Sequence, residues 1–223
     1  MKEVNIKYFM ILCLVLCYGC INDNKMKQVE LFEEKLLEYN YFDLNQIQDT
    51  VISNQVWNGG KNSELLKKVI NSSSTSLKSK FLAATILLEF ENKIDKKFHK
   101  NLSNVYAYAL THTSEKYDNI MHLNGNLWGF LYEENDLGKL GKHYVSFGQI
   151  AIPSLKKLLE DTDNQIFYDG SEEATLGNDY QYRVKDFAAF YISKIKDIPM
   201  TFYQDFEKRD AEIERLKEVL ENE

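Results

Sequence analysis

Apolar residues recur at helical spacing along most of the chain. The series Val184, Phe187, Ala188 and Tyr191 follows i, i+3, i+4 and i+7, the pattern of one face of an α-helix. The same analysis predicts helices near 29–37, 43–51, 63–70, 77–91, 98–109, 151–159, 184–195 and 205–222. No segment alternates convincingly between apolar and polar residues as a strand does. The pattern therefore predicts an all-α fold.

Two segments differ from this amphipathic pattern. Residues 77–91 are apolar on nearly every side, which indicates a central helix that its neighbours bury. The stretch 125–177 holds seven of the ten glycines, so we expect it to be rich in loops with long ordered connections. Pro153 falls in the first turn of a predicted helix, where a missing backbone donor costs little. The last predicted helix, 205–222, is highly charged and suits a solvated capping helix.

The first twenty residues have the three parts of an export signal. Lys2 and Lys7 form a charged start, and the apolar stretch 8–16 is about half the length needed to span a bilayer. The run Leu16-Cys17-Tyr18-Gly19-Cys20 resembles the lipobox of bacterial lipoproteins. This resemblance implies a signal peptide at 1–19, lipid attachment at Cys20, and a tether at 20–28 before a single domain at 29–223.

The resemblance also implies a location. A lipidated Cys20 would hold the domain on a membrane of the cell envelope, and Ile21, rather than aspartate, favours an outer membrane where the cell has one. Cys13 and Cys17 would leave with the signal peptide, so the mature domain would be stabilised by packing alone, without disulfides.

Charge bears on the choice of partner. The chain has 27 Lys and Arg against 34 Asp and Glu, a net charge of −7, and no run of basic residues predicts a nucleic-acid-binding face. We therefore expect no nucleic acid. The expected partners are the membrane, through the lipid on Cys20, and another protein of the envelope.

Two parts of the chain resemble each other. Leu66-Lys67-Lys68-Val69 precedes Ala83-Ala84, and Leu155-Lys156-Lys157-Leu158 precedes Ala188-Ala189. The second part, 148–196, resembles a HEAT-type helical repeat, and 63–91 does so faintly. The resemblance implies irregular helical hairpins of the right-handed α-α superhelix type, which bind other macromolecules, with a long ordered loop inserted in the second hairpin.

The inserted loop is the main candidate for a functional site, because long loops in compact helical domains are often functional. The partner-binding interpretation uses Trp128, Phe167 and Tyr168 as aromatic anchors and Asp169, Glu172 and Glu173 as complementary charges. The structural interpretation leaves Trp128 in the core and builds a polar network of helix caps and ion pairs. Its residues are Asp161, Thr175, Asn178, Arg183 and Asp186.

Catalytic and metal-binding patterns are weak. Counting from Asp161 gives an EF-hand-like spacing, but Ile166 stands where that loop needs glycine. The four histidines, His99, His112, His122 and His143, are scattered and form no zinc motif. We expect no metal, no cofactor and no catalytic residue. The alternatives are a carboxylate- or metal-dependent hydrolase that uses the acidic region 163–186, and an immunity-type protein that sequesters one toxin or enzyme.

Overall fold

The computed structural model describes residues 26–41, 50–112, 127–130, 136–164 and 172–222. These residues form helices and no strand, with one isolated bridge between Asn164 and Arg183. The all-α prediction is confirmed. The helical segments are 26–37, α2 (Thr50–Trp57), η1 (Asn58–Gly60), α3 (Ser63–Asn71), α4 (Leu77–Glu91), η2 (Lys96–Phe98), α5 (His99–His112), α6 (Gly138–Ser146), η4 (Gly148–Ala151), α7 (Ile152–Lys156), α8 (Glu172–Tyr180), α9 (Val184–Lys196) and α10 (Phe206–Glu221).

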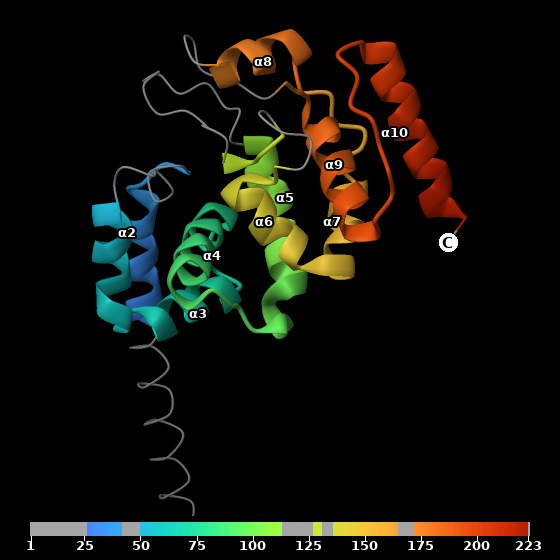
Figure 1. The fold of residues 1–223 in the computed structure, drawn as a ribbon. Helices are drawn as coiled ribbons and strands as arrows, with labels where there is room; N and C mark the ends of the chain where they lie inside the picture. The colour runs from blue at the N-terminus through green and yellow to red at the C-terminus, as the bar shows by residue number, and fades with distance from the viewer. Residues whose placement is uncertain (1–25, 42–49, 113–126, 131–135, 165–171, 223) are drawn as a thin grey trace, which may run out of the picture.

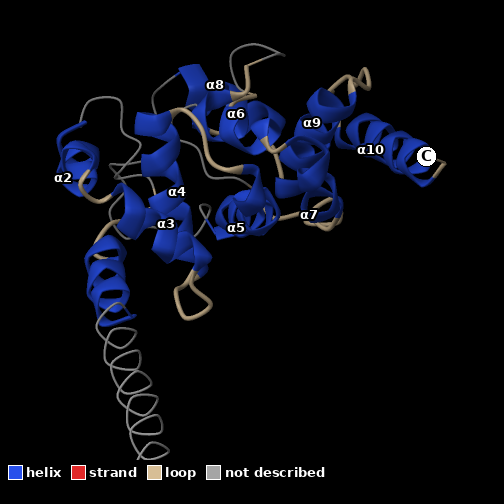
Figure 2. Cartoon of the chain, turned by 90° about the horizontal axis from the view of Figure 1, so that it is seen from below, coloured by secondary structure: helices blue, strands red, loops and turns tan. Residues whose placement is uncertain are grey.

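The helices form a broad row (Figures 1 and 2). The N-terminal helix 26–37 and α2 lie at one end of it, and α10 lies at the other. Between them, α4 packs against α2, α3 and α5, and α9 packs against α6, α7 and α10. Both predicted helix pairs are therefore in contact, α3 with α4 and α7 with α9. Whether the pairs stack as a right-handed superhelix stays a prediction.

Helix α4 is the most enclosed element of the N-terminal half. Ten consecutive residues, from Ser79 to Leu88, are buried, which confirms the prediction for 77–91. The helix begins after Ser76, whose side chain accepts a hydrogen bond from the backbone N–H of Ser79. Ala83 and Ala84 have no exposed surface, so neighbouring helices can approach the backbone closely.

Helix α9 has the same role in the C-terminal half. Its residues Val184 and Asp186–Ser193 are buried. The helix ends at Lys196, and Asp197, two residues before Pro199, adopts the left-handed conformation that commonly follows a helix end. In the last helix, Asp205 accepts a hydrogen bond from the backbone of Lys208 and so caps α10.

The prediction of a loop-rich stretch at 125–177 is wrong where α6 and the first part of α8 occur, because no helix was predicted there. α7 confirms part of the helix predicted at 151–159. Two glycines explain the error. Gly138 and Gly148 have φ values of 59° and 62° and mark the two ends of α6, so they separate short helices rather than forming loops. The predicted inserted loop likewise contains α8 in its second half.

The hydroxyl of Ser63, the first residue of α3, donates a hydrogen bond to Glu91 and does not cap the helix. Of two other local predictions, one is wrong and one falls mostly outside the described residues. The predicted tether ended at residue 28, but residues 26–28 are helical. Most of the helix predicted at 43–51 lies outside the described residues. Within the described part of the chain, no helix combines the length and apolar character that crossing a membrane requires.

Candidate functional site

Most of the aromatic and acidic residues predicted to bind a partner lie outside the residues that the structure describes. Phe167, Tyr168 and Asp169 lie outside the described residues. Glu172 and Glu173 begin α8, but their side chains also lie outside the described part. The partner-binding interpretation of this loop therefore stays a prediction.

Trp128 is the exception, and its prediction as an exposed anchor is wrong. Its side chain is only 1% exposed. The indole lies beside the rings of Phe81 and Tyr106, with ring centroids 6.3 Å apart in each case. Tyr191 donates a hydrogen bond of 2.6 Å to the backbone carbonyl of Trp128. The large ring fills the core between α4 and α5, as the alternative interpretation proposed.

The predicted polar network has its centre at the start of α9. Asp186 has no exposed surface and accepts hydrogen bonds from the backbone N–H, Nε and Nη2 of Arg183, at 2.8, 3.1 and 2.9 Å. The backbone contact is one half of a capping box, because Asp186 is the third residue of the helix. Arg183 and Asp186 thus form a buried, doubly bonded ion pair.

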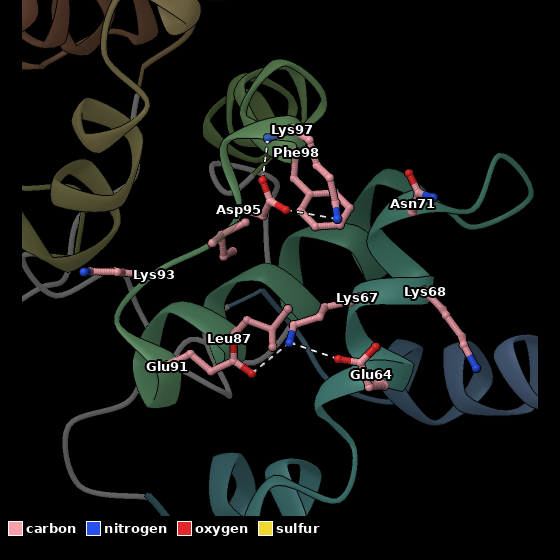
Figure 3. A pocket seen from close by; sticks show the side chains of 11 residues that line it. Glu64, Lys67, Lys68, Asn71, Leu87, Glu91, Lys93, Asp95, Lys97 and Phe98 are labelled. Atoms are coloured by element: carbon pink, nitrogen blue, oxygen red, sulfur yellow. Dashed lines mark hydrogen bonds and ion pairs between the residues drawn. The ribbon is translucent and has the colours of Figure 1, made fainter.

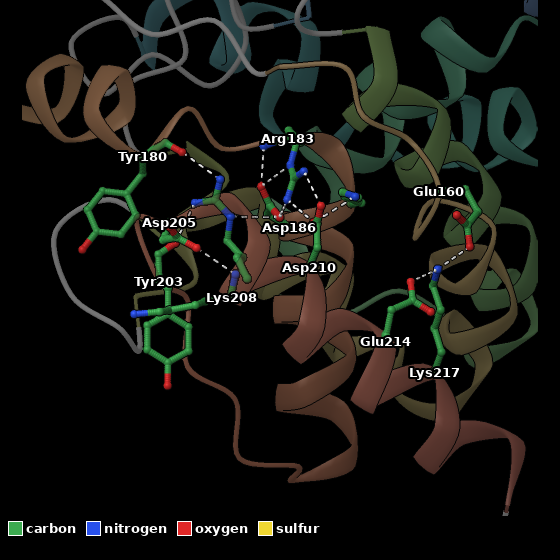
Figure 4. A network of polar contacts seen from close by, with 12 residues as sticks. Glu160, Tyr180, Arg183, Asp186, Tyr203, Asp205, Lys208, Asp210, Glu214 and Lys217 are labelled. Atoms are coloured by element: carbon green, nitrogen blue, oxygen red, sulfur yellow. Dashed lines mark hydrogen bonds and ion pairs between the residues drawn. The ribbon is translucent and has the colours of Figure 1, made fainter.

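A second arginine, which the sequence analysis missed, completes the network. Arg209 of α10 has no exposed surface, and its Nε lies 3.3 Å from Asp186 Oδ1. Its Nη1 donates to the carbonyl of Tyr203, and its Nη2 donates to the carbonyl of Tyr180 at the end of α8 (Figure 4). Arg209 therefore joins α8, α9 and α10 at one point.

Asp210 supplies the second negative charge. Arg183 donates to it at 2.6 Å, and Lys185 lies at 2.9 Å. Burial favours a higher pKa for Asp210, but the hydrogen bonds from Arg183 and Lys185 outweigh burial and lower its pKa. Burial lowers the pKa of Arg209, and the charge of Asp186 opposes this effect.

Among the remaining residues of the predicted network, Asp161 accepts two hydrogen bonds in the described structure. The side chain of Asp161 accepts a hydrogen bond from the backbone of Asp163, and its carbonyl accepts one from the backbone of Lys185. Thr175 is exposed, and the side chain of Asn178 lies outside the described residues. The described part of the network consists of cations and carboxylates that neutralise each other across α9 and α10.

This arrangement does not suit hydrolysis. A general acid needs a raised pKa and access to a substrate. The carboxylates with clearly shifted pKa values in the described part, Asp95, Glu160, Asp210 and Glu212, are all lowered by their hydrogen-bonding and cationic neighbours, which outweigh burial. Within the same residues, no group of three or more His, Cys, Asp or Glu side chains is placed to hold a metal.

A half-buried histidine lies on α6. His143 of α6 lies with its Nδ1 3.0 Å from the hydroxyl of Tyr106 on α5. Burial lowers its pKa to about 4, the positive charge of Lys139 adds to this effect, and Glu89 opposes it. His143 is therefore neutral at pH 7 and serves as a polar contact between two helices.

Two concave surfaces lie in the N-terminal half of the described chain. The first is a groove of about 610 Å³ between helix 26–37 and α2. Its apolar lining comes from Leu31, Phe32, Leu36, Tyr39, Val56 and Leu65, and polar side chains such as Lys35 and Gln55 complete it. Leu31 is 51% exposed, which is high for a leucine beside a groove.

The second concave surface is a pocket of about 430 Å³ between α3, the end of α4 and η2. Leu87, Ile94 and Phe98 form its apolar part, and charged residues surround them (Figure 3). Lys67 lies 3.1 Å from Glu64 and 3.3 Å from Glu91, and Lys97 lies 3.0 Å from Asp95.

Comparison of the chain with protein-family models, with curated protein sequences and with solved structures finds no match. The functional argument therefore depends on the residues and surfaces described above.

The sequence analysis missed two features: the buried position of Arg209 and a lysine-rich segment at 93–100. Arg209 precedes Ile213, Leu216 and Leu220 by 4, 7 and 11 residues, so it lies on the apolar face of α10. The octapeptide Lys93-Ile-Asp-Lys-Lys-Phe-His-Lys100 carries four lysines and one aspartate. A net charge of −7 for the whole chain conceals this local excess of positive charge.

Proposed function

We propose that this protein is a lipoprotein of the bacterial cell envelope, anchored through Cys20, whose HEAT-like helical domain binds another envelope protein. The signal-like N-terminus and the lipobox-like run Leu16–Cys20 support the anchor. The packed helix pairs α3–α4 and α7–α9 support the comparison with helical repeats. Binding is the proposed activity, and no catalytic step is part of it.

The groove between helix 26–37 and α2 carries the binding proposal. Its size falls within the range of sites that enclose a ligand segment. Protein-binding grooves typically have apolar residues at the centre and polar residues at the rim, as this groove does. The apolar contacts supply affinity, and the polar contacts supply specificity. Leu31 is the most exposed apolar side chain of this groove, so a partner's apolar residue would bury it.

The anchor is tested by the mass of the protein isolated from membranes. We expect a chain that begins at Cys20 and carries acyl groups, and we expect Cys20→Ser to abolish acylation. A mature chain that begins elsewhere, or one without acyl groups, would contradict the anchor.

The groove is tested by photo-crosslinking in cells. A photoreactive amino acid replaces Leu31 in one variant and Ile150, which is 44% exposed on η4 and not in the groove, in a control variant. We expect one abundant crosslinked protein from position 31 and not from position 150. We also expect Leu31→Glu to lower the yield of that protein at least fivefold in co-purification, with Ile150→Glu unchanged. Equal crosslinking at both positions, or none at position 31, would exclude the groove.

A further inference from the structure

Six lysines gather on the surface around the second pocket, which we name the basic surface. Lys67, Lys68, Lys93 and Lys97 line the pocket, and Lys96 and Lys100 are exposed within three residues of Lys97 in the chain. Three carboxylates, Glu64, Glu91 and Asp95, accompany them, so six positive charges meet three negative ones, a net charge of +3. The whole chain has a net charge of −7, so the rest of the sequence carries −10. The basic surface is therefore opposite in sign to the remainder of the protein.

Most of these lysines are available to an external anion. Lys67 and Lys97 pair with the three carboxylates. The other four are exposed and have no ion pair with any described residue: Lys68, Lys93, Lys96 and Lys100. Figure 3 shows Lys68 and Lys93 extending away from the ion pairs on opposite sides.

The lysines are also placed against the usual preference of a helix. Lys96 and Lys97 lie in η2 and Lys100 lies in the first turn of α5, so three lysines fall within five residues at this helix start. The first turn of α5 has no acidic residue, and the one carboxylate at the start of η2, Asp95, caps that helix by accepting a hydrogen bond from the backbone of Lys97. Lys96 and Lys100 have no acidic neighbour within the first turn of α5, so they add positive charge at this helix start.

The basic surface lies at the edge of the domain where the described chain begins. Figure 1 shows α3 and the N-terminal end of α5 at the lower edge of the domain, the same edge at which helix 26–37 starts. Cys20 precedes Met26 by six residues, which covalent geometry limits to about 20 Å. An acyl chain on Cys20 would hold this edge of the domain close to the headgroups.

We propose that the basic surface rests on anionic lipid headgroups of the membrane in which Cys20 is anchored, and so orients the domain. This inference rests on the proposed lipid anchor, which would keep the domain edge near the membrane. Charge complementarity between the lysines and the anionic headgroups would supply the contact. Positive side chains near a bilayer are attracted to anionic lipids within a Debye length, about 8 Å at physiological salt. With this edge toward the membrane, the acidic remainder of the domain extends away from it.

The test uses the lipidated protein reconstituted in vesicles of phosphatidylcholine alone or with three parts in ten of phosphatidylglycerol. A water-soluble amine-acylating reagent labels exposed lysines, and mass spectrometry measures the rate at each one. We expect Lys93 and Lys96 to react at least threefold more slowly in the anionic vesicles at low salt, with the difference lost at 0.5 M salt. Lys157, an exposed lysine beyond α7, is the internal control and should react equally in both.

A charge-reversal variant separates electrostatic contact from steric shielding. In Lys93→Glu/Lys96→Glu, we expect Lys68 and Lys100 to react as fast in anionic vesicles as in neutral ones. The matched variant Lys156→Glu/Lys157→Glu, which changes the same number of charges near α7, should keep their protection. Protection that is independent of lipid charge, or protection that survives charge reversal, would overturn the proposal.

The two proposals fail in different ways. Protein whose intact mass shows no acyl group contradicts the anchor, whatever the lysines do. Acylated protein whose Lys93 and Lys157 react alike in every vesicle contradicts the basic surface alone. If Lys93 is protected in cells but not in anionic vesicles, a protein and not the lipid covers the basic surface. That result would also contradict the inference.

Discussion

At the scale of single residues, the buried charges of Asp186 and Arg209 determine how α10 packs against α9. Both have no exposed surface, and each is charged. Burying a charge is costly unless an opposite charge and hydrogen bonds compensate for it. Asp186 receives both from Arg183, and Arg209 finds backbone carbonyls on two other segments. The network specifies how α10 docks because few other arrangements would satisfy these groups.

Replacing Asp186 by asparagine should therefore destabilise the protein by about 3 kcal/mol, since it leaves buried arginine charge without its partner. Urea unfolding followed by circular dichroism measures the change. The matched control is Asp163→Asn, an exposed residue whose side chain should matter by less than about 0.5 kcal/mol. Equal effects of the two substitutions would show that the network contributes little.

His143 should make stability depend on pH. Its folded pKa of about 4 lies below the unfolded value of about 6.5, so the unfolded chain binds a proton more readily. The stability present above pH 6.5 is therefore lost as pH falls toward 4. The expected loss from this residue between pH 7 and pH 5 is up to about 2 kcal/mol. In His143→Gln, the free energy of unfolding should fall by about 2 kcal/mol less between pH 7 and pH 5 than it does in the unchanged protein. If both proteins lose the same free energy over this range, His143 does not have the lowered pKa.

At the scale of elements, most helices form where the spacing of apolar residues predicts them, with α6 and α8 as exceptions, and several helix ends follow local chemistry. Ser76, Asp205 and Asp197 each mark a helix end through a cap or a left-handed turn. The sequence analysis failed where glycines were interpreted as loops. Gly141 lies inside α6, where its missing side chain allows Tyr191 of α9 to approach.

Gly141→Ala tests this close approach. Replacing glycine by alanine in a helix ordinarily stabilises it by up to about 1 kcal/mol. Here a Cβ atom would lie 2.8 Å from Tyr191 Cε1 and 3.0 Å from the carbonyl oxygen of Trp128. We therefore expect a loss of about 1–3 kcal/mol in thermal or urea unfolding. Lys142→Ala, at the next and exposed position, should change stability by less than about 0.5 kcal/mol. A stabilised Gly141→Ala variant would contradict the packing.

At the scale of the whole molecule, the row of helices contains two enclosed elements, α4 and α9, with more exposed helices at its ends. Elements with many buried apolar contacts open only when much of the protein unfolds, whereas exposed elements open locally. The groove and the basic surface both lie in the N-terminal half, and α3 contributes Leu65 to the groove and Lys67 and Lys68 to the basic surface. Binding and membrane contact would therefore involve the more exposed end of the row.

Native-state hydrogen exchange should reveal this gradient. We expect the slowest amides in α4 and α9, and faster exchange in α2, whose described residues include only two buried ones, Ser53 and Val56, and an exposed Val51 near its start. The measurement is mass spectrometry of exchanged peptides at a single pH. If the amides of α2 exchange as slowly as those of α4, the two ends of the row unfold as one unit, and the gradient does not exist.

By itself, the sequence determined the all-α class and the position of most helices, because helix formation depends on local spacing and on caps a few residues away. It also placed Arg183 and Asp186 in one polar network, since they are three residues apart. The tertiary structure alone decided that Trp128 is buried, that Arg209 joins this network, and that Lys67 and Lys93 share one surface. These facts depend on contacts between segments 20 or more residues apart, which local patterns do not encode.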